Sequence, residues 1–425
     1  MKKVKIVIAH PGKQHSIQFA EAVNNSNFDM TYITTVYDSK ASFLMKLVKL
    51  VSSSKNKQRA NARKSNILKD GQVKTFYSFI GLFRIFLAHY DKSLVLFHKA
   101  TVFLSKLFGE KVAEYAIDNN VDVVVSYDTF SGDLFKKLSK YNQKIIKVMD
   151  ASAANLAYQK QIFETDIELT PEYADKLLSE VSYTMEDNRN KLYIEEAKNA
   201  DYIIVASEFS KRSYVSVGVS PDKIFVCPYA IDIAKFEYKK VRNRKNKEIV
   251  FTFLGGTKQS KGLSYMLDAF QKLPRGKARL NIVGFDNLSL DLKNKYTNEI
   301  HYLGLKLHSE IPEILQNSDV VLFPSLSDGF GFAAAEGMAT GCPVIASDNS
   351  GICDLIIDEV NGFIVKTQST DELYNKMMWF IDNQDKIFDM GLAARKSIES
   401  LTREKYNDNI NYILSKIIKE TMGEE

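Results

Sequence analysis

The sequence predicts an α/β protein in which two doubly wound domains, each built on a parallel sheet, face a central cleft. The first observation is the length, because 425 residues are too many for one compact core and suit two domains of about 200 residues. The second is that short β-branched runs alternate with helical stretches, as in parallel sheets covered by helices. The third is that this alternation stops in a charged stretch and then begins again.

The first half of the chain contains four predicted strands. The first ends at Pro11–Gly12, and Ser16 can then cap a helix that continues to Ala22. The strands are Lys5–His10, Val121–Ser126, Lys144–Met149 and Tyr202–Ala206. We assign residues 1–235 to an N-terminal domain with a basic insertion at residues 40–112.

The second half repeats the pattern after a linker at residues 236–248, which is charged and poor in apolar residues. Its predicted strands are Ile249–Leu254, Leu280–Val283, Val320–Phe323 and Val344–Ala346. We assign residues 249–402 to a C-terminal domain and residues 403–425 to an amphipathic helix that crosses back to the first domain. Ligands of such folds bind at the carboxyl ends of the strands, so a site is expected in the cleft.

The composition excludes several classes of protein. Hydrophobic residues make up 45% and charged residues 26% of the chain, which excludes a largely disordered protein. The three cysteines, Cys227, Cys342 and Cys353, show no paired spacing, which argues against a disulfide framework and a zinc knuckle. No uncharged apolar stretch approaches the roughly 20 residues of a membrane span, and Ile6–Ala9 is too short for a signal-peptide core. We expect a cytoplasmic protein.

Positive charge is concentrated in the insertion. Residues 40–112 contain 15 Lys and Arg against 3 Asp and Glu, whereas the whole chain has a net charge of only +5. Apolar helical stretches at Phe76–Leu87 and Leu94–Phe108 interrupt the basic clusters. In the second stretch a stripe at helical spacing avoids Lys99 and Lys106; it consists of Leu94, Phe97, Ala100, Thr101, Leu104 and Phe108. The segment fits a helix on an anionic membrane or a core helix with a solvated basic face. Nucleic acid fits less well, because no recognition motif is present.

The block Val320–Val365 contains the residues that point most clearly to a binding site. Its loop, Leu326–Gly331, contains two glycines that allow close backbone approach, and the free N–H groups of the helix after it favour an anion such as a diphosphate. Asp328 and Glu336 are carboxylates eight residues apart, and each can accept both hydroxyls of a vicinal diol. The alternative is structural: Asp328 would cap the helix and Glu336 would be solvated.

A second block, Phe253–Ala269, contains a strand that runs into Gly255–Gly256 and a polar loop with Lys258 and Lys261. Lysine is a mobile point charge for phosphate oxygens. The loop lacks the G-K-[ST] sequence of a Walker A motif. The alternative is an ordinary turn with solvated lysines.

Together the two blocks resemble the retaining glycosyltransferases of the GT-B fold, family 4 type, also called glycosyl transferases group 1. The likeness is carried by the Gly-x-x…Lys-Gly segment, the strand NIVG ending at Gly284, HYLG, the PS strand and D-x7-E running into E-G-M-A-x-G-x-P-V-I-A. It is close over Ile249–Val365 and weaker over Ala197–Asp232. It implies two Rossmann-like domains.

The resemblance also implies roles for individual residues. Glu336 would bind the ribose of a nucleotide-sugar donor, and Lys261 would neutralise its diphosphate. Asp328 would hold the donor sugar together with the backbone of the loop, at Gly329, Phe330, Gly331 and Phe332. Base contacts would lie near Lys306 and Leu307. The loop after the first strand, with Gly12, Lys13 and His15, resembles the family's glycine-rich loop that faces donor phosphates and acceptor.

The sequence departs from the family pattern at three positions. Asp328 stands where Glu is usual, and Gly256 stands where Arg is usual, so Lys258 is a candidate for the second cation. Asp150 stands where a His often follows a strand, and it is a candidate for that role. No Asp-x-Asp occurs, so we expect neither a metal nor another cofactor, and Lys261 with the helix dipole would stabilise the leaving group.

The predicted function is therefore transfer of a sugar, with retention, from a nucleoside diphosphate to a glycan, lipid-linked or protein acceptor, by an enzyme that can be peripheral on the cytoplasmic face of a membrane. Two alternatives remain open. One is a nucleotide-sugar epimerase of the same architecture, although its acid/base carboxylates are not evident. The other is a non-catalytic protein that binds sugars or an anionic surface, because Gly256 and Asp328 would also fit a decayed site.

Overall fold

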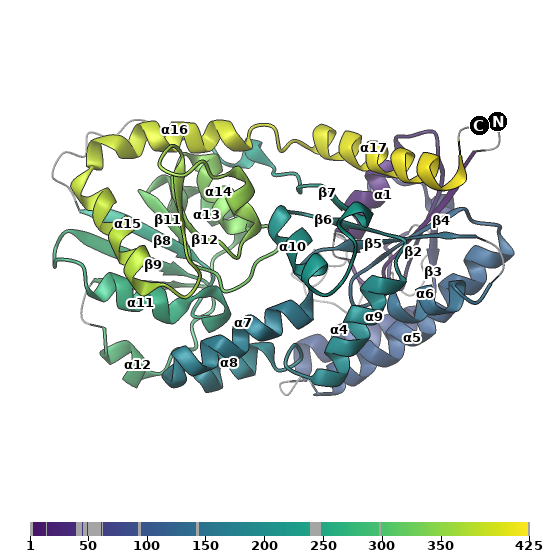
Figure 1. The fold of residues 1–425 in the computed structure, drawn as a ribbon, viewed down its shortest axis with the longest axis horizontal. Helices are drawn as coiled ribbons and strands as arrows, with labels where there is room; N and C mark the ends of the chain where they lie inside the picture. Colours follow the sequence, from purple (N-terminus) through teal and green to yellow (C-terminus); the bar gives the residue numbers. More distant parts are fainter. Residues whose placement is uncertain are drawn as a thin grey trace.

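The computed structural model describes residues 3–13, 15–39, 45, 49, 61, 63–91, 95–141, 144–238, 248–296 and 299–423. Two lobes lie side by side, each with a parallel sheet covered by helices (Figure 1). The predicted fold class is confirmed. Most of the predicted linker lies outside the described residues, as do Lys40, Lys55, Lys57 and Arg59 of the basic insertion.

The N-terminal sheet has seven parallel strands in the order β3-β2-β1-β4-β5-β6-β7. Its central strands consist of buried residues, as expected of a sheet with helices on both faces. The strands are β1 Lys5–Ala9, β2 Asp29–Thr34, β3 Val73–Thr75, β4 Val123–Tyr127, β5 Ile146–Ala151, β6 Tyr202–Val205 and β7 Ile224–Val226. The strands β2, β3 and β7 were not predicted from the sequence.

The helices of this half include α4 and α5, which come from the predicted insertion. They are α1 Ser16–Asn24, α4 Ser78–Tyr90, α5 Val95–Asp118, α6 Gly132–Leu138, α7 Leu156–Leu169, α8 Ala174–Val181, α9 Asp187–Asn199 and α10 Glu208–Ser216. Within the described ranges, no helix of the protein is both long and apolar enough to cross a membrane.

The C-terminal sheet has six parallel strands in the order β10-β9-β8-β11-β12-β13. They are β8 Ile249–Leu254, β9 Ala278–Val283, β10 Ile300–Gly304, β11 Val320–Phe323, β12 Val344–Ser347 and β13 Gly362–Val365. The helices are α11 Leu263–Gln271, α12 Leu290–Asn294, α13 Ile311–Gln316, α14 Phe332–Thr340, α15 Thr370–Asp382 and α16 Ile387–Ile398.

The last helix, α17 (Arg403–Met422), returns to the N-terminal lobe as predicted (Figure 1). Its buried face, which includes Ile410 and Leu414, joins the core that also contains residues of β1 and α1. The Asn411 side chain donates a hydrogen bond to the carbonyl of Ala22 at 3.1 Å. Both described ends of the chain therefore lie on the same lobe.

Helices α7 and α8 belong to the first half of the sequence but contact the C-terminal lobe along the lower edge of Figure 1. Phe163 and Leu177 pack in one apolar cluster with Tyr265 and Leu326 of the other lobe. The hydroxyls of Tyr173 and Tyr296 lie 2.8 Å apart. We call residues 156–181 the α7–α8 arm.

The stripe predicted on α5 faces the core. Leu104 and Phe108 are buried, and Phe97 and Thr101 are half-buried, while Leu94 lies outside the described residues. The apolar side chains that are exposed on α5 are instead Val95, Leu96, Val102 and Phe103. Of the two interpretations left open, the core-facing helix describes this stripe, because Leu104 and Phe108 pack in the cluster that contains residues of the sheet.

Candidate active site

The two blocks singled out in the sequence meet at the carboxyl ends of β8 and β11. Lys261 Nζ lies 2.6 Å from Asp328 Oδ2, an ion pair that joins the loop after β8 to the loop after β11. The backbone N–H of Leu326 donates to the carbonyl of Ser260 at 3.1 Å. These contacts hold the predicted cation and the predicted sugar-binding carboxylate at one point.

The loop after β11 is shaped by glycine. Gly331 has φ +95°, a backbone conformation that side chains disfavour, and it directly precedes the first residue of α14. Asp328 does not cap α14, contrary to the structural alternative. Its Oδ1 accepts the N–H of Phe330 at 3.1 Å, which leaves the first turn of α14 without a capping side chain. A helix start of this kind can receive an anion.

Glu336 lies on the second turn of α14 and is not a solvated residue. Its side chain is only 17% exposed, and burial raises the pKa of its carboxyl to about 7. The imidazole Nδ1 of His308, from the loop after β10, lies 3.9 Å from Glu336 Oε1. A half-buried carboxyl with no strong ion pair is available to a ligand's hydroxyl groups.

The loop after β8 explains one departure from the family pattern. Gly256 has φ +66°, and a Cβ atom there would lie 2.4 Å from the carbonyl oxygen of Phe285. No side chain fits at this position in the present backbone, so arginine is excluded. Lys258 is exposed, while Gly255 and Gly256 pack against the backbone that follows β9.

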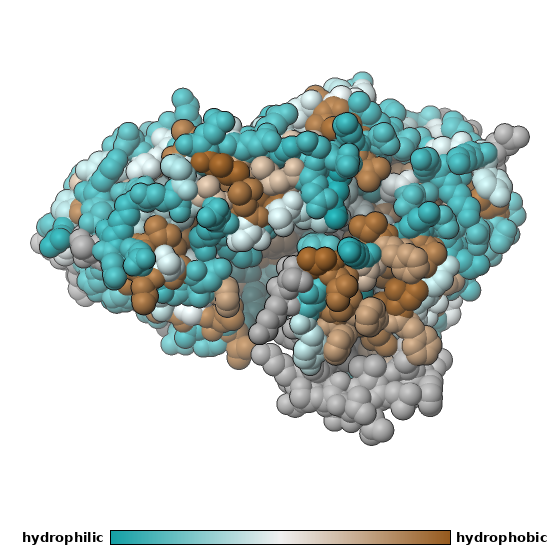
Figure 2. All heavy atoms as spheres, turned by 90° about the horizontal axis from the view of Figure 1, so that it is seen from below, coloured by the Kyte–Doolittle hydropathy of each residue, from teal (hydrophilic) through white to brown (hydrophobic). Residues whose placement is uncertain are grey.

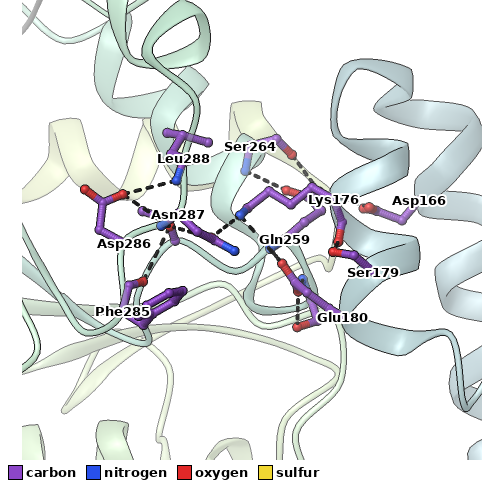
Figure 3. Close-up of polar contacts among 12 residues, drawn as sticks. Asp166, Lys176, Ser179, Glu180, Gln259, Ser264, Phe285, Asp286, Asn287 and Leu288 are labelled. Carbon is purple, nitrogen blue, oxygen red and sulfur yellow. Dashed lines mark hydrogen bonds and ion pairs between the residues drawn. The ribbon is translucent and has the colours of Figure 1, made fainter. Parts of the chain in front are cut away.

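The α7–α8 arm makes hydrogen bonds to the loop after β8, which contains Lys258 and Lys261 (Figure 3). Glu180 Oε1 accepts the N–H of Gln259 at 2.9 Å, and Oε2 accepts the N–H and the hydroxyl of Ser260 at 2.9 and 2.7 Å. The Gln259 amide donates to Asp166 Oδ2 at 2.9 Å. Sequence reasoning missed this support, because Glu180 and Asp166 lie about eighty residues or more before their partners and stand in no motif.

The loop after β1 reaches the first residue of α14 through aromatic contacts. The ring of His15 stacks on Tyr229 at 4.2 Å and on Phe332 at 5.8 Å, measured between centroids. Burial lowers the pKa of His15, so its imidazole is neutral at pH 7. Gly12 lies in the same loop, where its N–H donates to His10 Nδ1 at 2.8 Å. The structure therefore places His15 beside the loop predicted to bind the donor.

Asp150 is placed near the site, but its carboxyl is covered. The residue is 3% exposed at the end of β5, and burial together with the neighbouring charge of Asp128 raises its pKa to about 8. The chain just beyond it touches the β11 loop, since a Cβ on Gly329 would lie 2.7 Å from the Ser152 carbonyl oxygen. Contact between Asp150 and a ligand would require the covering side chains to move.

Lys306 and Leu307 directly precede His308, the residue that approaches Glu336. Lys306 and Leu307 are exposed after β10, where the N–H of Leu307 donates to Glu310 at 2.7 Å. A cavity of about 310 Å³ lies between α5, α6 and α9 in the N-terminal lobe, and none of the predicted site residues lines it.

Comparison with known proteins finds a family match in the second half of the chain. Residues 234–397 match the glycosyl transferases group 1 family. A curated relative, the UDP-Gal:alpha-D-GlcNAc-diphosphoundecaprenol alpha-1,3-galactosyltransferase of Escherichia coli, is 30% identical over 39% of this chain and 47% of its own length. The chain spans about half the length of the curated relatives it matches first.

Solved structures share the whole architecture. The sucrose-phosphate synthase of Thermosynechococcus elongatus superposes with a TM-score of 0.64 at 16% identity, over 99% of this chain and 100% of that one. HepE of Anabaena, in complex with UDP, gives 0.61 at 16% identity over 98% and 100%. Residues 234–397 therefore match the glycosyl transferases group 1 family, and the chain as a whole has the two-domain GT-B fold.

Proposed function

We propose that this protein is a retaining glycosyltransferase that moves a sugar from a nucleoside diphosphate to an acceptor hydroxyl during assembly of a glycan. The observation that carries the proposal is the contact of Lys261 with Asp328 at the start of α14, within the segment that matches the family. In the structure the Asp328 carboxylate is the ion-pair partner of Lys261. A diphosphate would take its place as the partner of Lys261 and free Asp328 for sugar hydroxyls.

The proposed chemistry needs charge stabilisation and orientation more than proton transfer by the protein. Lys261 and the N–H groups at the start of α14 would stabilise the negative charge that grows on the leaving diphosphate. Glu336 would fix the ribose, and Asp328 would fix the sugar. The acceptor would attack on the face that the diphosphate leaves, and the leaving phosphate would help take its proton. No metal enters this scheme, which predicts full activity in excess chelator.

The test is hydrolysis of nucleotide sugars with no acceptor present. UDP-glucose and UDP-galactose are the first probes, because similar proteins are named for UDP and UDP-Gal, and GDP sugars follow. Slow release of free sugar that Lys261→Ala abolishes would support the enzyme. Tight nucleotide binding without turnover of any donor, with or without candidate acceptors, would identify a binding protein and overturn the proposal.

We also propose that the acceptor is anchored in a membrane. Four exposed aromatic residues lie on one face of α4, at spacings of four, three and four, and we call them the aromatic stripe: Phe79, Phe83, Phe86 and Tyr90. Figure 2 shows the brown hydrophobic surface gathered on the side of the molecule that carries α4 and α5. The E. coli relative is named for a diphosphoundecaprenol-linked acceptor.

Sedimentation with vesicles tests the membrane part separately. Vesicles with anionic lipid should carry the protein down at low salt, and Phe83→Ser with Phe86→Ser should weaken this binding by about tenfold or more through lost apolar contact. Tyr412→Ser is the matched control, because Tyr412 is 69% exposed on α17 of the same lobe. If the Tyr412→Ser control and the stripe variant bind the vesicles equally well, α4 is not the membrane-binding surface.

A further inference from the structure

Three basic side chains from different elements gather beside the loop after β1. Lys13 belongs to that loop, Arg63 to the segment before β3, and Arg84 to α4. The guanidinium Nη1 of Arg84 lies 3.9 Å from the position of a Cβ on Gly12. Burial lowers the pKa of Lys13 and of Arg84, and the positive charge of Arg63 lowers both further, so Arg63 repels each of the other two cations.

Close packing of α4 against the segment after β2 places Arg84 beside the loop after β1. Gly81, one turn earlier in α4, is buried, and a Cβ there would lie 2.3 Å from Thr35 Oγ1. The same Thr35 hydroxyl donates to the carbonyl of Pro11 at 2.6 Å. Arg84 Nε donates to Thr101 Oγ1 at 2.8 Å, and its guanidinium lies 5.0 Å from the ring centre of Phe97. Arg84 is thus held in place by neutral groups.

No carboxylate balances the cluster. Among the residues that the structure describes, none forms an ion pair with Lys13, Arg63 or Arg84, and only cations and tyrosines act electrostatically on them. Both arginines are half-buried, and removal of a cation from water without a partner is costly. Repulsion between these cations destabilises the free protein, and a bound anion would offset that repulsion.

We infer that Lys13, Arg63 and Arg84 form a binding site for a phosphate or diphosphate group carried by the acceptor. Guanidinium groups bind phosphate oxygens in pairs, and a lysine adds a mobile charge. The inference rests on the proposed function and deepens it, because it assigns the acceptor an anionic group. All three residues belong to the N-terminal lobe, whereas Lys261 and the start of α14 belong to the C-terminal lobe.

The position relative to the aromatic stripe agrees with this assignment. Arg84 is on α4, and its guanidinium is directed inward to Gly12, while Phe83 and Phe86 beside it in sequence are 57% and 54% exposed. One helix therefore presents a cation to the loop after β1 and aromatic rings to the outside. A lipid with a phosphate headgroup could satisfy both faces, and a soluble sugar phosphate could satisfy the first.

The experiment is calorimetric titration of inorganic pyrophosphate into protein already saturated with its preferred nucleoside diphosphate. We expect pyrophosphate to bind under these conditions, and Arg84→Gln and Arg63→Gln each to weaken it at least tenfold. Lys106→Gln is the matched control, because Lys106 is an exposed cation on α5. Nucleoside diphosphate affinity and the melting temperature of each variant, measured in parallel, should equal those of the wild type.

Two results would overturn the inference. One is unchanged pyrophosphate affinity in Arg84→Gln. The other is complete competition between pyrophosphate and the nucleotide together with weaker nucleotide binding in the variants, since the cluster would then be part of the donor site. Failure of every nucleotide to bind would instead contradict the proposed function, and the pyrophosphate titration could still be read.

A second arm identifies the source of the phosphate. Phosphatidylcholine vesicles are prepared with and without farnesyl diphosphate. Stronger sedimentation of the wild type with the doped vesicles, lost in Arg84→Gln, supports a lipid-linked acceptor. Pyrophosphate binding without any effect of the doping supports the same site for a soluble phosphorylated sugar.

Discussion

The ionisation of Glu336 should make nucleotide binding depend on pH in a defined window. The pKa of this carboxyl is raised to about 7 by burial, so about half of the free protein carries it protonated at neutral pH. An ionised carboxylate accepts two hydroxyls, whereas a protonated one must give up part of that capacity. If the ribose diol binds the ionised form, affinity should rise by about tenfold from pH 6 to pH 8.

The test variant is Glu336→Gln, which keeps the shape of the side chain and removes its ionisable carboxyl group. At pH 8 the variant should bind nucleoside diphosphate about 1–3 kcal/mol more weakly, because it loses hydrogen bonds to a charged acceptor. At pH 6 the difference should shrink, since most of the wild-type carboxyl is then neutral. Ionisation of the ligand's own phosphates affects both proteins equally and cancels in the ratio of their dissociation constants.

Isothermal titration calorimetry in two buffers of different ionisation enthalpy measures both affinity and proton release. The wild type should release up to one proton on binding below pH 7, and Glu336→Gln should release less by that amount. Glu313→Gln, an exposed carboxylate on α13, is the control. The reasoning is refuted if Glu336→Gln keeps the wild-type pH slope, or if a 2′,3′-dideoxy nucleotide shows the same slope as the ribonucleotide.

Three further outcomes are expected. Lys261→Ala should lower the turnover of donor hydrolysis by about 10²-fold or more and nucleotide affinity much less, because charge on the diphosphate grows as the bond breaks; a comparison of single-turnover rates with calorimetry separates the two. Asp150→Asn should raise the melting temperature near pH 9 and change it little near pH 4. The folded pKa of about 8 lies above the ordinary 3.8, so the neutral carboxyl stabilises the fold at low pH and this contribution is lost as the pH rises toward 8. Gly329→Ala should lower activity and stability, by about 1–3 kcal/mol, because the added methyl would meet Ser152 and Ala153 across the domain contact, whereas Gly71→Ala, where no atom lies within 4 Å, should be neutral by thermal melting.

The fold could be predicted well from the sequence because the central strands are continuous apolar runs. The predicted Ile249–Leu254 and Val320–Phe323 coincide with β8 and β11. Five strands were not predicted: β2, β3, β7, β10 and β13. Of these, β3 and β7 have only three residues each, and β2 begins with Asp29 and contains two Thr. All but β2 lie at the edges of the two sheets. Such strands form because neighbouring strands provide hydrogen-bond partners, which a local pattern does not reveal.

The site could be predicted only where its residues stand in one contiguous block. The Lys261–Asp328 contact follows from two loops that begin at adjacent strands, β8 and β11. The support by Glu180 and the cluster at Arg84 could not be foreseen, because each depends on packing between distant segments. The role of Gly256 also needed the structure, which shows that the backbone of Phe285 occupies the space of a side chain.

The return of α17 has a consequence for the order in which the protein is made. The helix covers α1 and contributes Ile410, Ile413 and Leu414 to the core of the lobe that contains the first strand. On the ribosome α1 emerges before the C-terminal lobe, yet this part of its core waits for residues beyond 402, so α1 keeps an uncovered apolar face until α17 has emerged. Folding intermediates of the nascent chain should therefore be prone to aggregation or to chaperone binding at α1, and the C-terminal domain folds as an insertion within a lobe that is still incomplete.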